Sequence, residues 1–178
     1  MRVLKSTLGF SMLGLMLTGS LQAATTVTGV VNATLTLTSS CLVNGATGAT
    51  GLDFGDLSFG STTTFFTEAD SQVMADAGGA LSIQCSAGTS PVITVGAGSH
   101  DGLSTGGTRA LSDGNSNYVP YDLYSDSGHN TIVAINGTVS PGASSGAAQT
   151  INLYGKAVGK AGLPAGTYSD TINVSLTF

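Results

Sequence analysis

Apolar and polar residues alternate along several stretches of the chain with a period of two, which is the pattern of β-strands that bury one face. The most regular stretch is Thr25–Thr38, in which hydroxyl side chains occupy most of the intervening positions. Its apolar face consists of Val27, Gly29, Val31, Ala33, Leu35 and Leu37. The last stretch of the chain is equally regular, and its apolar face consists of Tyr168, Ile172, Val174, Leu176 and Phe178. Both stretches are predicted to be strands.

Further strand patterns lie between these two stretches, separated by turns rich in Gly, Ser, Asn and Asp. They cover residues 79–86, 91–99, 117–126, 131–136 and 148–159, with two short aromatic segments at 52–60. Residues 67–77 are compatible with one or two turns of helix, and no other stretch has a convincing helical pattern. Six to eight short strands predict an all-β fold of the immunoglobulin-like sandwich type.

The N-terminus has the three regions of a secretory signal peptide. Arg2 and Lys5 precede an apolar run that ends in small residues at Ala23. The uncharged run is borderline for a membrane span of roughly 20 residues, and a strand pattern follows it directly. A signal peptide over residues 1–23, cleaved near Ala23 or Ala24, is therefore favoured over a membrane anchor. The chain is expected to be exported.

The charge of the exported chain excludes two classes of partner. Without Arg2 and Lys5, three basic residues remain against ten acidic ones, a formal net charge of −7. Nucleic acids and anionic membrane surfaces bind proteins through clustered Lys and Arg residues, so neither is expected as a partner. The hydrophobic fraction of 41% and the clean alternation indicate that residues 39–178 can form the core of one domain.

The chain contains two cysteines, Cys41 and Cys85. In an exported protein with no third thiol, one disulfide is the most economical interpretation. A metal site is less favoured because no His lies near either cysteine, and a catalytic thiol is less favoured in an oxidising compartment.

The final strand is expected to have an uncovered edge. No strand pattern follows Phe178, so the unpaired backbone groups and the apolar cleft beside that strand need another strand to cover them. Thr25–Thr38 is a spare strand of suitable length. Only Ser39 and Ser40 separate it from Cys41, and two residues reach about 7 Å. This favours donation of the strand to a neighbouring molecule, while a sharp turn would allow the alternative, a self-contained sandwich.

Several stretches together carry a resemblance to a known family. They are "VTGVVNATLTLTSSC", "FGDLSFG", "LSIQC", "RALSDG" with "YVPYDLYSD", and "LPAGTYSDTINVSLTF". The chain resembles the spore coat protein U domain family and, within it, the major-type pilin subunits of archaic, Csu-type chaperone-usher pili. The match covers essentially all of residues 24–178.

The resemblance implies an incomplete immunoglobulin-like sandwich that is completed by donor strand complementation. The donor strand, within residues 24–38, would present Val27, Gly29, Val31, Ala33, Leu35 and Leu37. The acceptor cleft would be bordered by Ile172, Val174, Leu176 and Phe178, and the disulfide would join Cys41 to Cys85. The family implies a periplasmic chaperone, an outer-membrane usher and other pilin subunits as partners.

The function implied is a structural pilus subunit on the bacterial surface that serves adhesion and biofilm formation. No enzymatic activity, cofactor or small-molecule substrate is expected. The alternative is a secreted, self-complete coat or surface-layer protein.

Two motifs suggest chemistry on weaker grounds. "GASSG", residues 142–146, matches the nucleophile elbow pattern with Ser144 at its centre, and His100 and Asp101 are possible triad partners. The elbow requires a strand before it and a helix after it, and a strand pattern follows here instead, so a Gly/Ser loop is favoured. "DGNSNY" opens like a calcium loop at Asp113, but the required Gly and Glu are missing, so a turn is favoured.

Two other residues have simple structural interpretations. Arg109 is the only arginine beyond the signal peptide, so it is expected to form a structural ion pair. Its candidate partners are Asp113, Asp122 and Asp126. His129, in "SDSGHN", is interpreted as a solvated loop residue.

Overall fold

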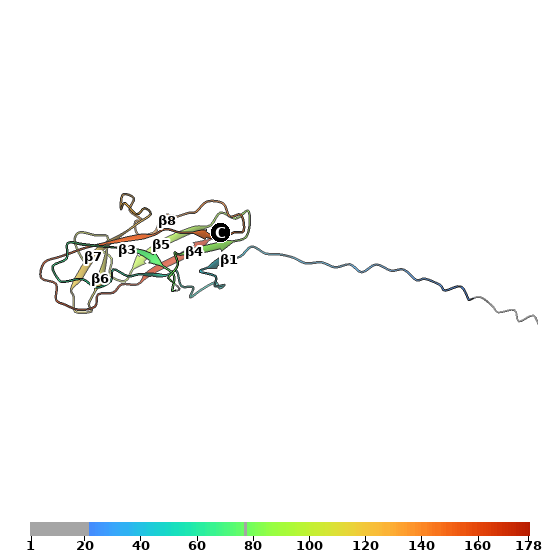
Figure 1. Ribbon diagram of the computed structural model, residues 1–178, viewed down its shortest axis with the longest axis horizontal. Helices are drawn as coiled ribbons and strands as arrows, with labels where there is room; N and C mark the ends of the chain where they lie inside the picture. The colour runs from blue at the N-terminus through green and yellow to red at the C-terminus, as the bar shows by residue number, and fades with distance from the viewer. Residues whose placement is uncertain (1–21, 77) are drawn as a thin grey trace, which may run out of the picture. The chain divides into compact units, whose positions relative to one another are not determined.

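The computed structural model describes residues 22–76 and 78–178 (Figure 1). The predicted signal peptide, residues 1–23, lies almost entirely outside the described residues. The chain divides after Thr36, and Leu37–Phe178 forms a compact unit. Residues 22–40 are exposed throughout and belong to no strand. Thr25–Thr38 therefore has the sequence pattern of a strand but pairs with no other strand in the single chain. An extended segment becomes a strand only when it pairs with another.

The prediction of an all-β fold is confirmed, because the described residues contain eleven strands and no helix. The strands are β1 (Cys41–Val43), β2 (Asp56–Leu57), β3 (Glu68–Met74), β4 (Ser82–Cys85), β5 (Val92–Gly98), β6 (Arg109–Ser112), β7 (Tyr118–Tyr124), β8 (Gly137–Val139), β9 (Gln149–Thr150), β10 (Tyr154–Val158) and β11 (Ile172–Thr177). Within the part of the chain that the structure describes, no helix is long and apolar enough to cross a membrane.

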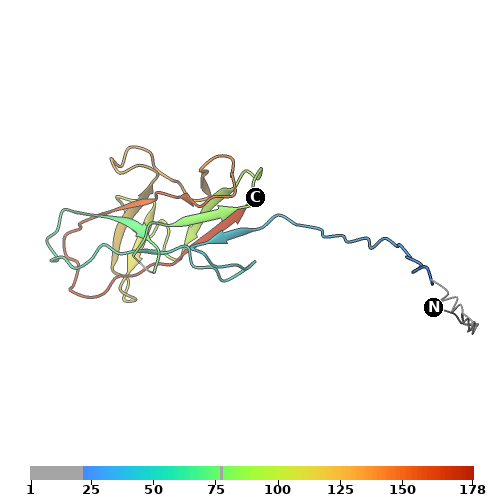
Figure 2. The same cartoon turned by 45° about the vertical axis from the view of Figure 1, so that its right-hand side comes forward.

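The strands form three antiparallel sheets. Their orders are β1-β4-β9, β2-β3-β10-β7-β6 and β11-β5-β8. In Figure 2 the red strand β11 runs beside the green strand β5. The core lies between the sheets and is built from the inward positions of the alternating strands, of which Ile83, Ile93, Leu123 and Tyr121 are almost fully buried.

Two of the sequence-based element assignments are wrong. Residues 67–77 contain the strand β3 instead of helical turns, because Ala69 and Val73 face the core and the backbone pairs with β10. The segment 131–136 is not a strand: Ile132 makes one isolated bridge, and a turn at Asn136, with a φ of 62°, precedes β8. Strand β6 was not among the predicted elements, although it pairs fully with β7.

A β-bulge marks the pairing of β11 with β5. Ile172 pairs with Gly98 and Val174 pairs with Val95, so β5 carries one extra residue at this point. Gly96 lies at the bulge, where a Cβ atom would come within 2.8 Å of the backbone oxygen of Asn173. The close approach of the two backbones therefore requires glycine at this position.

Candidate functional site

An open groove lies between residues 52–62 and the chain that leads into β11. One part is a cavity of about 360 Å³, and the other is a cavity of about 680 Å³. The two cavities share five lining residues, among them Leu57, Phe59 and Asp170, so they are neighbouring parts of one groove. Most of the residues that line the first part are apolar, and they include core residues such as Leu81, Val95 and Leu123. Asp53, Asp56 and Asp170 add polar groups to the lining. The groove thus opens directly onto the hydrophobic core.

The residues predicted to border an acceptor cleft occupy different parts of this region. Ile172 and Val174 line the first cavity. Leu176 packs against the core, half-buried, but lines neither cavity. Phe178 follows the end of β11 and is 50% exposed. The inward face of β11 is only partly covered, whereas the inward residues of β4 and β5 are buried.

Strand β11 is an edge strand. It pairs with β5 on one side, and among the described residues its other side belongs to no ladder. An edge of this kind presents unpaired N–H and C=O groups in a row, which is a template for another strand. An apolar groove and a free backbone edge therefore lie beside each other in the fold.

The predicted donor residues are available for such pairing. Val27 and Val31 are 94% and 96% exposed, and Leu35 and Leu37 are both 83% exposed. Gly29 and Ala33 are exposed as well. A row of exposed apolar side chains of this kind is unusual on a protein surface.

Asp170 forms a polar junction in the floor of the groove. Its Oδ2 accepts a hydrogen bond of 2.7 Å from the Tyr121 hydroxyl, and its Oδ1 accepts one of 2.9 Å from the Ser99 backbone N–H. His100 Nδ1 lies 3.0 Å from the same Oδ1. Burial, together with the bond to Asp170, raises the pKa of Tyr121, so this hydroxyl keeps its proton and remains a donor. These bonds tie the chain that enters β11 to the loop after β5 and to β7.

Arg109 is fully buried beside the bulge, and the predicted ion pair with Asp113, Asp122 or Asp126 is wrong. Its Nη1 donates a hydrogen bond of 2.9 Å to the Gly96 backbone oxygen and lies 3.8 Å from Asp101 Oδ1. The three candidate carboxylates accept hydrogen bonds from nearby turn and loop residues instead: Asp113 from Asn117, Asp122 from Thr108 and Asp126 from Thr131. The arginine therefore provides a donor for a carbonyl at the bulge and places its charge near Asp101.

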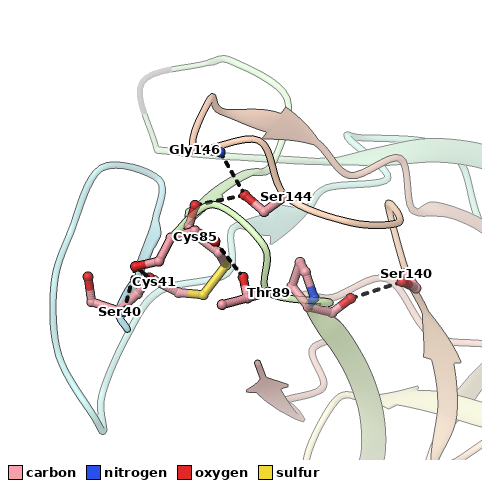
Figure 3. Close-up of a disulfide and its surroundings, with 9 residues drawn as sticks. Ser40, Cys41, Cys85, Thr89, Ser140, Ser144 and Gly146 are labelled. Atoms are coloured by element: carbon pink, nitrogen blue, oxygen red, sulfur yellow. Dashed lines mark hydrogen bonds between the residues drawn. A yellow bond between two sulfur atoms is a disulfide. The ribbon is translucent and has the colours of Figure 1, made fainter. Parts of the chain in front are cut away.

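The residues considered for catalysis are not brought together. Ser144 is buried, and its hydroxyl donates a 2.7 Å hydrogen bond to the Cys85 backbone oxygen (Figure 3). His100 lies against Asp170 rather than Ser144. Asp101 accepts a hydrogen bond from the Gly98 N–H and lies near Arg109. Each side chain thus has a structural partner of its own.

His129 lies in the loop between β7 and β8, as expected, but it is not a solvated residue. Its side chain is 16% exposed, and its ring packs edge-on against Tyr124 with a centroid separation of 5.0 Å. Its Nε2 lies 3.9 Å from Asp70 Oδ1. The carboxylate of Asp113 accepts hydrogen bonds from Asn115 and Asn117 within its own turn, and these bonds lower its pKa. In residues 22–76 and 78–178, no group of three His, Cys, Asp or Glu side chains is arranged to bind a metal.

Comparisons with known proteins give one family match and a structural likeness. A family model described as the Spore Coat Protein U domain matches residues 27–175. A search of the curated proteins finds no match. Among solved structures, the chain is similar to a chain of the CsuC-CsuE chaperone-tip adhesion subunit pre-assembly complex, from the archaic chaperone-usher Csu pili of Acinetobacter baumannii. The identity is 21% and the TM-score is 0.47, over 80% of this chain and 40% of that chain.

Proposed function

The chain belongs to the Spore Coat Protein U domain family, and from this membership we propose that it is a structural pilus subunit that polymerises by donor strand exchange. One observation carries the proposal: the described residues include a sheet edge without a partner strand and, separately, an exposed segment with the sequence pattern of a strand. β11 has a free edge beside an open apolar groove, and Thr25–Thr38 has an exposed apolar face with the period of a strand. The proposed occupant of the groove is residues 25–38 of a second copy.

The exposed donor face supplies enough free energy for a lasting joint. Burial of a Val or Leu side chain contributes roughly 1.5 to 3 kcal/mol. Val27, Val31, Leu35 and Leu37 together would contribute on the order of 10 kcal/mol before the cost of ordering the segment. The backbone of the added strand would gain ladder hydrogen bonds along β11, and the alternating side chains would set its register.

The geometry of such a joint leads to a filament. A donor at one place on the subunit and an acceptor at another form a heterologous contact, in which each copy uses two different surfaces. Such contacts continue from copy to copy unless the rotation between subunits happens to close a ring. Each subunit would therefore fill the groove of its neighbour and offer its own groove to the next.

The proposal includes partners and a location. Until a neighbouring subunit arrives, the groove leaves Ile172 and Val174 only partly covered and the β11 edge without a partner strand, so a periplasmic chaperone would cover them during export. An outer-membrane usher would then direct exchange of the chaperone for the next subunit. The assembled filament would lie on the bacterial surface and serve adhesion and biofilm formation. In this proposal the protein has no enzymatic role.

The test compares the exported chain with and without residues 25–38. The full chain is expected to form polymers that appear as ladders on denaturing gels without heating. The truncated chain is expected to form none, and an added synthetic peptide of residues 25–38 should bind it as a one-to-one complex. Ladders from the truncated chain, or a stable full-length monomer that needs no chaperone, would contradict the proposal.

A further inference from the structure

The N-terminal segment joins the folded unit at a point that is held by a covalent bond. Cys41, the first residue of β1, is the first buried residue after the exposed stretch 22–40. It forms a disulfide with Cys85, the last residue of β4. The two cysteines are also register partners in the β1-β4 ladder. The disulfide therefore connects the start of the fold to the strand that lies between β1 and β9.

Hydrogen bonds between Ser40 and Ser86 reinforce this point. The Ser86 backbone N–H donates to the Ser40 backbone oxygen at 2.9 Å, and the Ser40 N–H donates to the Ser86 hydroxyl oxygen at 2.9 Å. The Ser86 hydroxyl also lies 3.2 Å from the Ser40 backbone oxygen. Ser40, which precedes Cys41, is thus hydrogen-bonded to Ser86, which follows Cys85, directly beside the disulfide.

Ser144 holds Cys85 from another segment of the chain. Its buried hydroxyl donates to the Cys85 backbone oxygen at 2.7 Å (Figure 3). Its backbone N–H donates to the Thr89 oxygen, and its backbone oxygen accepts from the Gly88 N–H, both at 2.9 Å. Ser144 therefore binds the end of β4 and the turn after it by three separate bonds.

We propose that Ser40, Cys41, Cys85, Ser86 and Ser144 form a mechanical anchor, through which tension on the N-terminal segment passes into β4. This inference rests on the proposed function, because only a donor segment held by a neighbour carries tension along a filament. A pull on Thr25–Thr38 reaches the fold at Ser40. The anchor determines which strand receives that pull.

Without the disulfide, β1 is a weak attachment. It has three residues, and among the described strands its ladder is with β4 alone, so the pull would detach it by breaking a few hydrogen bonds one after another. With the disulfide, Cys41 cannot separate from Cys85, and the pull is passed to β4. That strand contains the fully buried Ile83 and pairs on both sides. Ser144 then resists displacement of the end of β4.

The experiment stretches assembled filaments and records the force and length of each extension step. Filaments of the Cys41→Ala/Cys85→Ala variant are expected to extend first at lower force than wild-type filaments. The disulfide spans a sequence separation of 44 residues, so its loss should add about 150 Å to the length released when a subunit unfolds completely. If that variant does not assemble, reduction of wild-type filaments, checked by thiol labelling, should give the same two changes.

A second variant tests the anchor with the disulfide intact. Ser144→Ala is expected to lower the force of the first extension without adding length. Ser140→Ala is the matched control, because its hydroxyl donates to the Pro91 backbone oxygen at 2.9 Å and touches neither cysteine. Its filaments are expected to match the wild type.

The inference is overturned if the first extension occurs at wild-type force in the absence of the disulfide and in Ser144→Ala. That result would not contradict the proposed function, in which donor strands join the subunits of the filament. Failure of the proposed function is recognised separately, since the truncation of residues 25–38 would then leave polymers intact.

Discussion

Leu35 provides the sharpest test of the donor face. Its side chain is 83% exposed in the single chain, so its substitution should not disturb the folded unit. In the proposed joint the side chain is buried in an apolar groove. Leu35→Ala would remove most of that burial, at a cost of roughly 1.5 to 3 kcal/mol, which is about 10- to 150-fold in the equilibrium between joined and free subunits.

Leu35→Asp should have a much larger effect, because it adds a charge that must lose its hydration in an apolar site. Its expected result is the loss of polymers while a subunit bound to its chaperone persists. The matched control is Thr36→Asp, which places the same charge one position along the chain, on the opposite face of the strand. We expect Thr36→Asp to assemble.

The assay is the fraction of subunits in gel ladders before heating, together with filaments seen by electron microscopy. Equal loss of polymers in Leu35→Asp and Thr36→Asp would refute the reasoning, because the effect would then not depend on the face. Normal filaments from both variants would refute it as well.

Three further predictions concern the folded unit, measured by urea unfolding of the subunit bound to the peptide of residues 25–38. Gly96→Ala places a Cβ atom 2.8 Å from a β11 backbone oxygen, and it should lower the unfolding free energy by about 1 to 3 kcal/mol, with Gly79→Ala as an unobstructed control. Tyr121→Phe removes the hydrogen bond to Asp170 and should cost about 1 to 3 kcal/mol, and a loss below the error of the measurement would contradict the role of that bond. Hydrogen bonds from the Asn130 and Thr131 backbone lower the pKa of Asp126 in the folded state, so its contribution to stability is present above about pH 4 and lost on further acidification; Asp126→Asn should flatten the decline between pH 5 and pH 2.

The strand pattern predicted much of the fold because alternation reports directly which positions face a core. β4, β5, β7 and β11 all lie within stretches that alternate in the sequence. Residues 67–77 were assigned wrongly because Glu, Ala, Gln and Met have a good intrinsic tendency to form helix, and the ladder with β10 overrides that tendency. At 131–136 the apolar residues suggested a strand, but pairing with β7 is limited to one bridge at Ile132, and the left-handed Asn136 then turns the backbone into β8.

The polar contacts could not be predicted from the sequence as the strands could, because they join residues of different strands and loops. Ten carboxylates are available to Arg109, and spacing along the chain does not say which one the fold brings close. Asp101 is the partner because the turn after β5 lies beside the start of β6, where the Gly102 N–H donates a hydrogen bond to the Thr108 backbone oxygen. Asp170 was likewise overlooked, since its role depends on Tyr121 and Ser99 from other parts of the chain. The apolar faces of Thr25–Thr38 and β11 were recognisable because each lies within one continuous stretch.

The central claim is that the free edge of β11 takes a strand from another copy of the chain. The most direct measurement is a structure of the assembled filament in which the backbone can be traced from Thr25 to Phe178. The account predicts that residues 25–38 of one subunit form a hydrogen-bonded ladder with β11 of the next, with Val31 and Leu35 in the groove. A ladder between these residues and β11 of the same chain, or a β11 edge without any added strand, would contradict it.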